Sequence, residues 1–116
     1  DGFTEAKVFE IGYGEIFLGD KSPDGVQLRP HIVWFGEAVP KIGKAIDIVS
    51  RADILLIVGS SLSVYPAAGL YRYAPSSAPV FLIDPADVNV RDKRVRHIRA
   101  VASEGMEEFT RLVREM

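Results

Sequence analysis

The sequence predicts an α/β fold of the doubly wound type, in which helices cover both faces of a parallel sheet. Two short apolar runs, residues 54–58 and 80–83, are rich in β-branched side chains and have the length of buried strands. Apolar residues at helical spacing lie between and around these runs. The resulting order of strand, helix, strand, helix, strand is the pattern that right-handed crossovers build into such a sheet.

The composition fits one small globular domain. The chain has 116 residues, of which 47% are hydrophobic and 26% charged, enough to bury a core. The formal net charge is −2, so no overall basic field would attract nucleic acid or an anionic membrane, and we expect neither as a partner. There is no cysteine, which excludes disulfides and thiolate metal sites. No signal-like region or membrane-length apolar run occurs, so we expect a cytoplasmic location.

The N-terminal part has the features of a small appendage. Residues 6–18 alternate apolar and polar side chains on either side of Gly12-Tyr13-Gly14, which predicts a β-hairpin. Gly-Tyr-Gly lacks the third glycine of a dinucleotide fingerprint and opens no helix, so we interpret it as a turn. The turn formers of residues 19–25 then mark a boundary near residue 27.

A third apolar run, residues 32–35, follows Pro30 and predicts a strand. It ends at Phe35-Gly36-Glu37, where a glycine stands beside an aromatic ring and a carboxylate. Two interpretations stay open: a ligand-facing edge, or a strand that runs into an ordinary loop with Trp34 and Phe35 in the core.

Three helical segments are expected. Residues 40–52 begin near Pro40 and carry one apolar stripe. Residues 65–74 form a second, shorter piece. Residues 103–116 form the last helix, with Ser103 as its N-cap. The buried face of this last helix is expected to hold Met106, Phe109, Leu112 and Val113.

The basic run of residues 91–99 holds five Lys or Arg side chains. It has no interleaved aromatic residues, so we interpret it as a solvated edge and keep phosphate binding as the alternative.

Polar residues follow each of the two main strands, where parallel sheets bind ligands. Gly59 permits close approach of a ligand, and the hydroxyls of Ser60 and Ser61 can bind phosphate or ribose oxygens. Asp84 could accept hydrogen bonds from ribose hydroxyls. The alternatives are an ordinary strand-to-helix turn at Gly59 and a carboxylate that caps its own turn at Asp84.

Neither histidine stands beside a nucleophile or carboxylate in the sequence, so His31 and His97 are interpreted as structural. The chain has no Gly-x-Ser-x-Gly elbow, Walker loop or paired-histidine motif.

Two segments resemble the sirtuins: L-R-P-H-I-V-W-F-G-E at residues 28–37 and G-S-S-L-S-V-Y-P-A-A-G at residues 59–69. The resemblance runs from about Ser22 to the end. It implies the second half of a Rossmann-like catalytic domain, with residues 1–27 as the tail of the small, usually zinc-binding domain and residues 28–116 as the C-terminal part of the NAD-binding domain. Sirtuins are NAD-dependent protein lysine deacylases, which transfer the acyl group from lysine to ADP-ribose and release nicotinamide.

The resemblance also implies two sets of site residues. One set would line the acyl-lysine cleft, with the substrate peptide pairing as a strand between its two segments; it comprises Val33, Phe35, Gly36, Glu37, Ser63, Val64 and Tyr65. The other set would bind NAD; it comprises Gly59, Ser60, Ser61, Asp84, Pro85, Ala86 and Ala102. The sequence departs from the family pattern at Ala100, where glycine is usual, and at Asp84, where asparagine is usual. Asp84 loses a donor but keeps its acceptors.

The family's catalytic histidine and glycine-rich NAD loop belong to an upstream segment, so no catalytic residue is expected in this chain. We therefore expect a fragment that is inactive alone and needs the missing N-terminal half of the domain. Ser22 stands near the position of a family zinc cysteine, and we expect no structural zinc. The alternatives are a non-catalytic adenine-nucleotide-binding module and a pure interaction domain.

Overall fold

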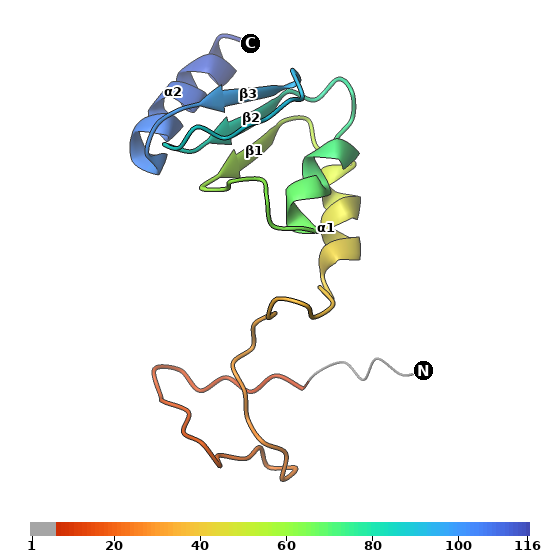
Figure 1. The fold of residues 1–116 in the computed structure, drawn as a ribbon, viewed down its shortest axis with the longest axis vertical. Helices are drawn as coiled ribbons and strands as arrows, with labels where there is room; N and C mark the ends of the chain where they lie inside the picture. The colour runs from red at the N-terminus through yellow and green to blue at the C-terminus, as the bar shows by residue number, and fades with distance from the viewer. Residues whose placement is uncertain (1–6) are drawn as a thin grey trace. The chain divides into compact units, whose positions relative to one another are not determined.

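The structure is a computed structural model that describes residues 7–116. The chain divides into two compact units, Asp1–Ala38 and Val39–Met116, which are described separately. The helices and strands assigned within the described residues all belong to the second unit (Figure 1). In chain order they are α1 (Ile42–Val49), β1 (Leu55–Val58), the 3₁₀ helix η1 (Ala67–Tyr73), β2 (Val80–Ile83), β3 (Val95–Ile98) and α2 (Ala102–Arg114). Across the described residues, every helix is too short or too polar to traverse a bilayer.

The three strands form one parallel sheet in the order β1-β2-β3. Their last residues are in register, because Val58 is paired with Ile83 and Ile83 with Ile98. The carboxyl ends of all three strands therefore meet at one edge. The α/β parallel sheet predicted from the sequence is confirmed, and the basic run contributes its edge strand β3, which sequence reasoning described only as a solvated edge.

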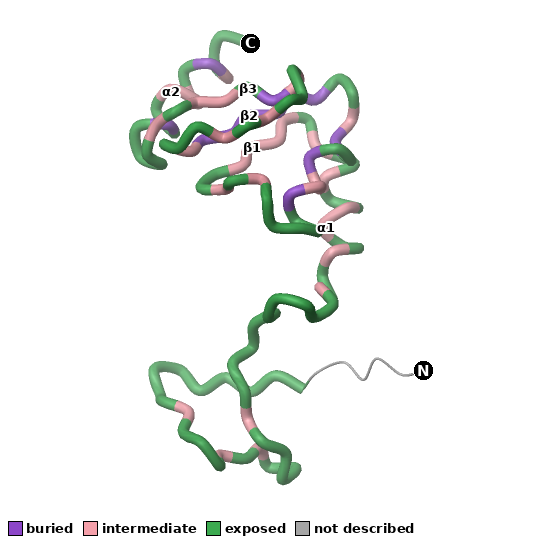
Figure 2. Tube along the Cα trace, viewed as in Figure 1, coloured by how far each residue is buried: buried purple, intermediate pink, exposed green. Residues whose placement is uncertain are grey.

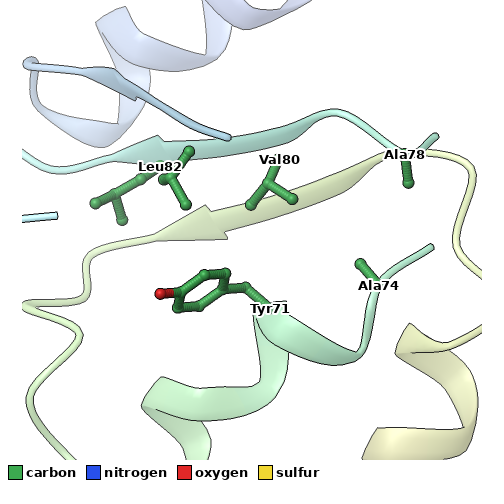
Figure 3. Packing of buried hydrophobic residues seen from close by; sticks show 6 residues of the cluster. Tyr71, Ala74, Ala78, Val80 and Leu82 are labelled. Carbon is green, nitrogen blue, oxygen red and sulfur yellow. The ribbon is translucent and has the colours of Figure 1, made fainter. Parts of the chain in front are cut away.

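One face of the sheet carries the main core. Val80 and Leu82 of β2 are 1% and 0% exposed and pack with Tyr71, Ala74 and Ala78 (Figure 3). Figure 2 shows the buried residues gathered in the sheet and in the segments against it. Alternate strand residues point to one face, so β2 supplies Val80 and Leu82 to this side and Phe81 and Ile83 to the other.

The opposite face is covered by α2. The Phe81 and Phe109 rings meet edge to face, with centroids 5.1 Å apart and an interplanar angle of 79°. Gly105 is buried against Ile83 so closely that an added Cβ would lie 2.3 Å from Ile83 Cγ2. Only glycine allows the helix to approach the strand at this point.

Several expectations for this unit need correction. The strand at residues 54–58 is not buried on both faces: β1 is half-buried, and Val58 is 44% exposed, because α2 lies over β2 and β3. Ser103 is not the N-cap of the last helix. Val101 holds that position, no side chain caps the helix, and Gly105 rather than Met106 faces the sheet.

The first unit does not form the strands predicted for it. Within residues 7–18 the turn at Gly12-Tyr13 forms, with Gly14 N–H donating to Ile11 C=O over 3.0 Å, but no strand flanks it; Ala6 lies outside the described residues. An antiparallel bridge between Lys21 and Gln27 closes the next turn instead. Residues 32–35 also form a loop, since none of the described backbone offers them a ladder of hydrogen bonds.

Candidate nucleotide-binding edge

The candidate site lies at the edge where the three strands end. The ladder continues one residue past β1 and past β2, because Gly59 N–H donates to Ile83 C=O (2.8 Å) and Asp84 N–H donates to Ile98 C=O (3.2 Å). Gly59 and Asp84 are thus fixed side by side on neighbouring strands. Gly59 has φ +66°, and nothing lies within 4 Å of the position of a Cβ. The left-handed conformation favours glycine, and the space before it is open to a ligand.

Two serine hydroxyls follow Gly59. Ser60 Oγ accepts a hydrogen bond from Leu62 N–H (3.1 Å) and so keeps its own proton available for donation to a ligand oxygen. Ser61 Oγ and Ser63 Oγ lie 2.5 Å apart and share one hydrogen bond. The loop therefore presents hydroxyl donors on a backbone that is tied to the sheet.

The two oxygens of the Asp84 carboxylate differ in their hydrogen bonding. Oδ1 accepts the Ala86 N–H over 2.8 Å, which is the local turn cap that the sequence left as an alternative. Oδ2 makes no hydrogen bond within residues 7–116 and remains an acceptor at the edge. Pro85 and Ala86 are exposed beside it, and Ala102, also exposed, begins α2 at the same edge.

Two residues of the basic run support this edge, and sequence reasoning assigned them no place in it. His97 Nε2 lies 2.9 Å from Asp84 C=O, and Arg99 Nε donates to Pro85 C=O over 3.4 Å. The sequence did hold a signal for this, because the basic run stands directly before the last helix. A strand at that position pairs with β2 and ends beside Asp84. His97 thus holds the turn backbone, in agreement with its interpretation as structural.

The segment Ser63, Val64 and Tyr65 continues from the serine loop and is exposed along its length. Val64 C=O accepts the Ala68 N–H (2.9 Å), but the three N–H groups of this segment have no acceptor within the described residues. Exposed, unpaired backbone donors are what an added peptide strand requires.

In the first unit, an ion pair closes the loop that contains the other predicted cleft residues. Arg29 binds both Glu37 carboxylate oxygens (3.1 and 2.8 Å), and Glu37 Oε1 also accepts the Trp34 N–H (3.1 Å). These bonds, first that from Arg29, lower the pKa of Glu37 below its usual value. Gly36 turns the chain with φ +85°.

Glu37 is thus engaged in holding its own loop. Phe35 is 92% exposed, and Val33 is exposed as well, so neither Trp34 (54% exposed) nor Phe35 belongs to the core of the described chain. The predicted NAD residues and Ser63, Val64 and Tyr65 all lie in the second unit. The pairing of Ser63, Val64 and Tyr65 with the loop from Val33 to Glu37 stays a prediction.

No group of three or more metal-ligating side chains occurs among residues 7–116. The absence of structural zinc from the protein as a whole stays a prediction.

Comparison with known proteins identifies the family. The model of the Sir2 family matches residues 7–66, which include the first segment of the sirtuin resemblance (28–37) and residues 59–66 of the second. This chain belongs to the Sir2 family. An NAD-dependent protein deacylase of Bacteroides thetaiotaomicron is 55% identical over 100 residues, which are 85% of this chain and 43% of the relative. One from Helicobacter pylori (strain 26695) is 44% identical over 103 residues, covering 88% of this chain and 45% of the relative.

Solved structures agree in fold. A mutant Sir2 homologue in complex with ADP-ribose superimposes with a TM-score of 0.77 at 30% identity, covering 97% of this chain and 47% of that one. A Sir2 homologue in complex with NAD gives a TM-score of 0.72 at 29% identity over 97% of this chain and 46% of that one. This Sir2 chain therefore spans less than half the length of the relatives and structures that it matches.

Proposed function

We propose that this Sir2 chain is part of an NAD-dependent protein lysine deacylase, which transfers an acyl group from lysine to ADP-ribose with release of nicotinamide. The observation that carries the proposal is the strand-end edge, where Gly59 and Asp84 are fixed side by side by ladder hydrogen bonds of 2.8 and 3.2 Å. Membership of the Sir2 family and likeness to structures holding ADP-ribose and NAD support it.

The residues at this edge fit a dinucleotide. A backbone open at Gly59 admits phosphate oxygens, and the Ser60 hydroxyl has a proton to donate to them. The free Oδ2 of Asp84 can accept from ribose hydroxyls, although asparagine is usual there in the family. Pro85, Ala86 and Ala102 would border the adenosine. When bound, NAD supplies the ADP-ribose acceptor of the acyl group.

The exposed backbones of Val33, Phe35 and Gly36, and of Ser63, Val64 and Tyr65, would hold the acyl-lysine peptide as an added strand. Sir2 structures with a p53 peptide and NAD and with a propionylated peptide support such a substrate class. Glu37 would act here through its ion pair with Arg29, which shapes the loop, rather than by contact with the peptide.

We assign the catalytic base to residues outside these 116. The test is an intact mass measurement of the natural protein, followed by a nicotinamide-release assay with an acetylated peptide and NAD. We expect the isolated chain to release none, and a longer form about twice its length to release nicotinamide only when both substrates are present. Release by the isolated chain, or none by the longer form, would refute the proposal.

Replacement of Asp84 tests the NAD assignment in the active form. Asp84→Ala removes a charged acceptor, so the KM for NAD should rise about tenfold. Asp84→Asn keeps an acceptor for Ala86 N–H and should change the KM less than threefold. Asp87→Ala removes a nearby exposed carboxylate and serves as the matched control. If Asp84→Ala and Asp87→Ala raise the KM for NAD equally, Asp84 has no specific role in NAD binding and the assignment of this edge is refuted.

The second candidate is a non-catalytic adenine-nucleotide-binding module, which is favoured by one observation: the whole strand-end edge belongs to the second unit alone. This alternative predicts ADP-ribose binding without acyl-peptide binding. The cytoplasmic location stays a prediction, which cell fractionation would test.

A further inference from the structure

The second unit contains a groove outside the predicted NAD edge. It has a volume of about 430 Å³ and runs between η1 and the loop before β3. We call it the tyrosine–arginine groove; its polar lining consists of Tyr65, Tyr71, Arg72, Asn89, Arg91 and Asp92. Leu62 and Val90 contribute apolar side chains.

The charge of the groove is positive. Neither Arg72 nor Arg91 forms an ion pair within residues 7–116, and Arg72 lies with its guanidinium carbon 5.8 Å from the centre of the Tyr71 ring. Asp92 is the one carboxylate of the lining, and its Oδ1 accepts the Arg94 N–H over 2.9 Å. Two guanidinium groups therefore face a single carboxylate that is partly engaged with its own backbone.

The groove adjoins the segment that we assign to peptide binding. Tyr65 belongs to both: it ends the exposed segment of Ser63, Val64 and Tyr65 and lines the groove. In a paired strand the side chains alternate between the two faces. A peptide held along Ser63–Tyr65 would therefore project side chains near its acyl-lysine into the groove.

We propose that the tyrosine–arginine groove is a substrate subsite that binds a carboxylate, an Asp or Glu side chain within a few residues of the acyl-lysine. This inference rests on the proposed function. Guanidinium groups match carboxylates in geometry and charge, whereas a Lys or Arg side chain would meet two like charges. The tyrosine rings and the apolar residues can pack against the methylene groups of a glutamate.

The experiment measures the binding of fluorescent acetyl-lysine peptides to the longest natural form of the protein by anisotropy. Glutamate is placed in turn at each of the three positions on either side of the acetyl-lysine, and matched peptides carry Gln, Lys or phosphoserine there. We expect one or two positions at which Glu binds about tenfold more tightly than Gln and Lys binds more weakly than Gln.

The variants Arg72→Gln and Arg91→Gln should reduce the Glu-to-Gln preference, and the double variant should bring it close to one. Arg114→Gln is the matched control, because Arg114 is an exposed arginine at the end of α2 that makes no ion pair within the described residues. This control should keep the full preference, and circular dichroism checks that each variant is folded.

The outcomes separate the two proposals. Deacylation without any preference at these positions overturns the subsite and leaves the proposed function intact. Preference for Glu without deacylation supports the subsite and refutes the catalytic role, and failure to bind any acetyl-lysine peptide overturns both. Preference for phosphoserine alone, or a loss equal in Arg114→Gln, overturns the carboxylate assignment.

Discussion

Strand β2 and the segment of residues 32–35 are similar in sequence and different in structure. Val80-Phe81-Leu82-Ile83 and Ile32-Val33-Trp34-Phe35 are both four apolar residues with β-branched or aromatic side chains. The first run is paired on both sides and 0–3% exposed. The second forms a loop in which every residue is at least 48% exposed.

The two runs differ in structure because only β2 has neighbouring segments to pair with and to pack against. Backbone groups of β2 find ladders on β1 and β3, and its two faces find the core around Tyr71 and the helix α2. The other run instead sits in a loop closed by Arg29 and Glu37. Strand propensity describes how well a residue fits a sheet, so a run of similar propensity forms no strand where no neighbouring strand pairs with it.

The largest expected effect follows from truncating one side chain in each run. Leu82→Ala should lower the free energy of unfolding by about 3 kcal/mol, because it opens a cavity at a residue that is 0% exposed. Val33→Ala should change it by less than about 0.5 kcal/mol, because that side chain is already 48% exposed. Urea unfolding of this chain, followed by circular dichroism, measures both.

If Leu82→Ala and Val33→Ala lower the free energy of unfolding by similar amounts, residues 32–35 are packed in solution, and the contrast between this segment and β2 is wrong. If Val33→Ala becomes costly only in a longer form of the protein, the segment gains its partner there.

A smaller effect is expected at the seat of α2 on β2. Gly105→Ala places a Cβ 2.3 Å from Ile83 Cγ2, and the resulting displacement should cost about 1–3 kcal/mol despite the better helix propensity of alanine. Gly43→Ala in α1 is the matched control, since nothing lies within 4 Å of its added methyl group, and it should stabilise by about 0.5 kcal/mol. The same unfolding measurement applies. Stabilisation by both changes would show that α2 does not rest on Ile83.

These contrasts explain what the sequence could and could not predict. The run at residues 80–83 predicted β2 correctly, because all four of its side chains are buried within this chain. The stripe at residues 40–52 predicted a helix that forms over the shorter range Ile42–Val49, without a fully buried residue. The predicted strand at residues 32–35 was wrong, since no segment among residues 7–116 pairs with it. Ser103 fitted the cap pattern, but α2 begins at Ala102 with Val101 as its N-cap, and the close contact of Gly105 with Ile83 in its first turn is not visible in local sequence.

At the candidate site, the spacing predicted that Gly59 and Asp84 follow strands, and the parallel register puts them side by side. The tyrosine–arginine groove could not be anticipated in this way. Its residues come from a turn, a 3₁₀ helix and a loop, which are related by packing rather than by any short motif.

The smallest effect concerns the loop that the Arg29–Glu37 pair closes. The hydrogen bonds that the Glu37 carboxylate accepts from Arg29 and from Trp34 N–H lower the pKa of Glu37. The contribution of these bonds to loop order is therefore complete above the ordinary Glu pKa of about 4.3 and is lost as the pH falls through the lower pKa of the folded state. Trp34 is the only tryptophan and reports this loop alone. Its emission should change in one step with a midpoint below about pH 4.3. Glu37→Gln should abolish the step, whereas Glu10→Gln, which removes an exposed carboxylate elsewhere in the first unit, should leave it. If the change in Trp34 emission persists in Glu37→Gln, the acid transition belongs to unfolding of the chain as a whole. The loop would then not depend on this one ion pair, and it would not differ in this respect from the sheet, which its core stabilises.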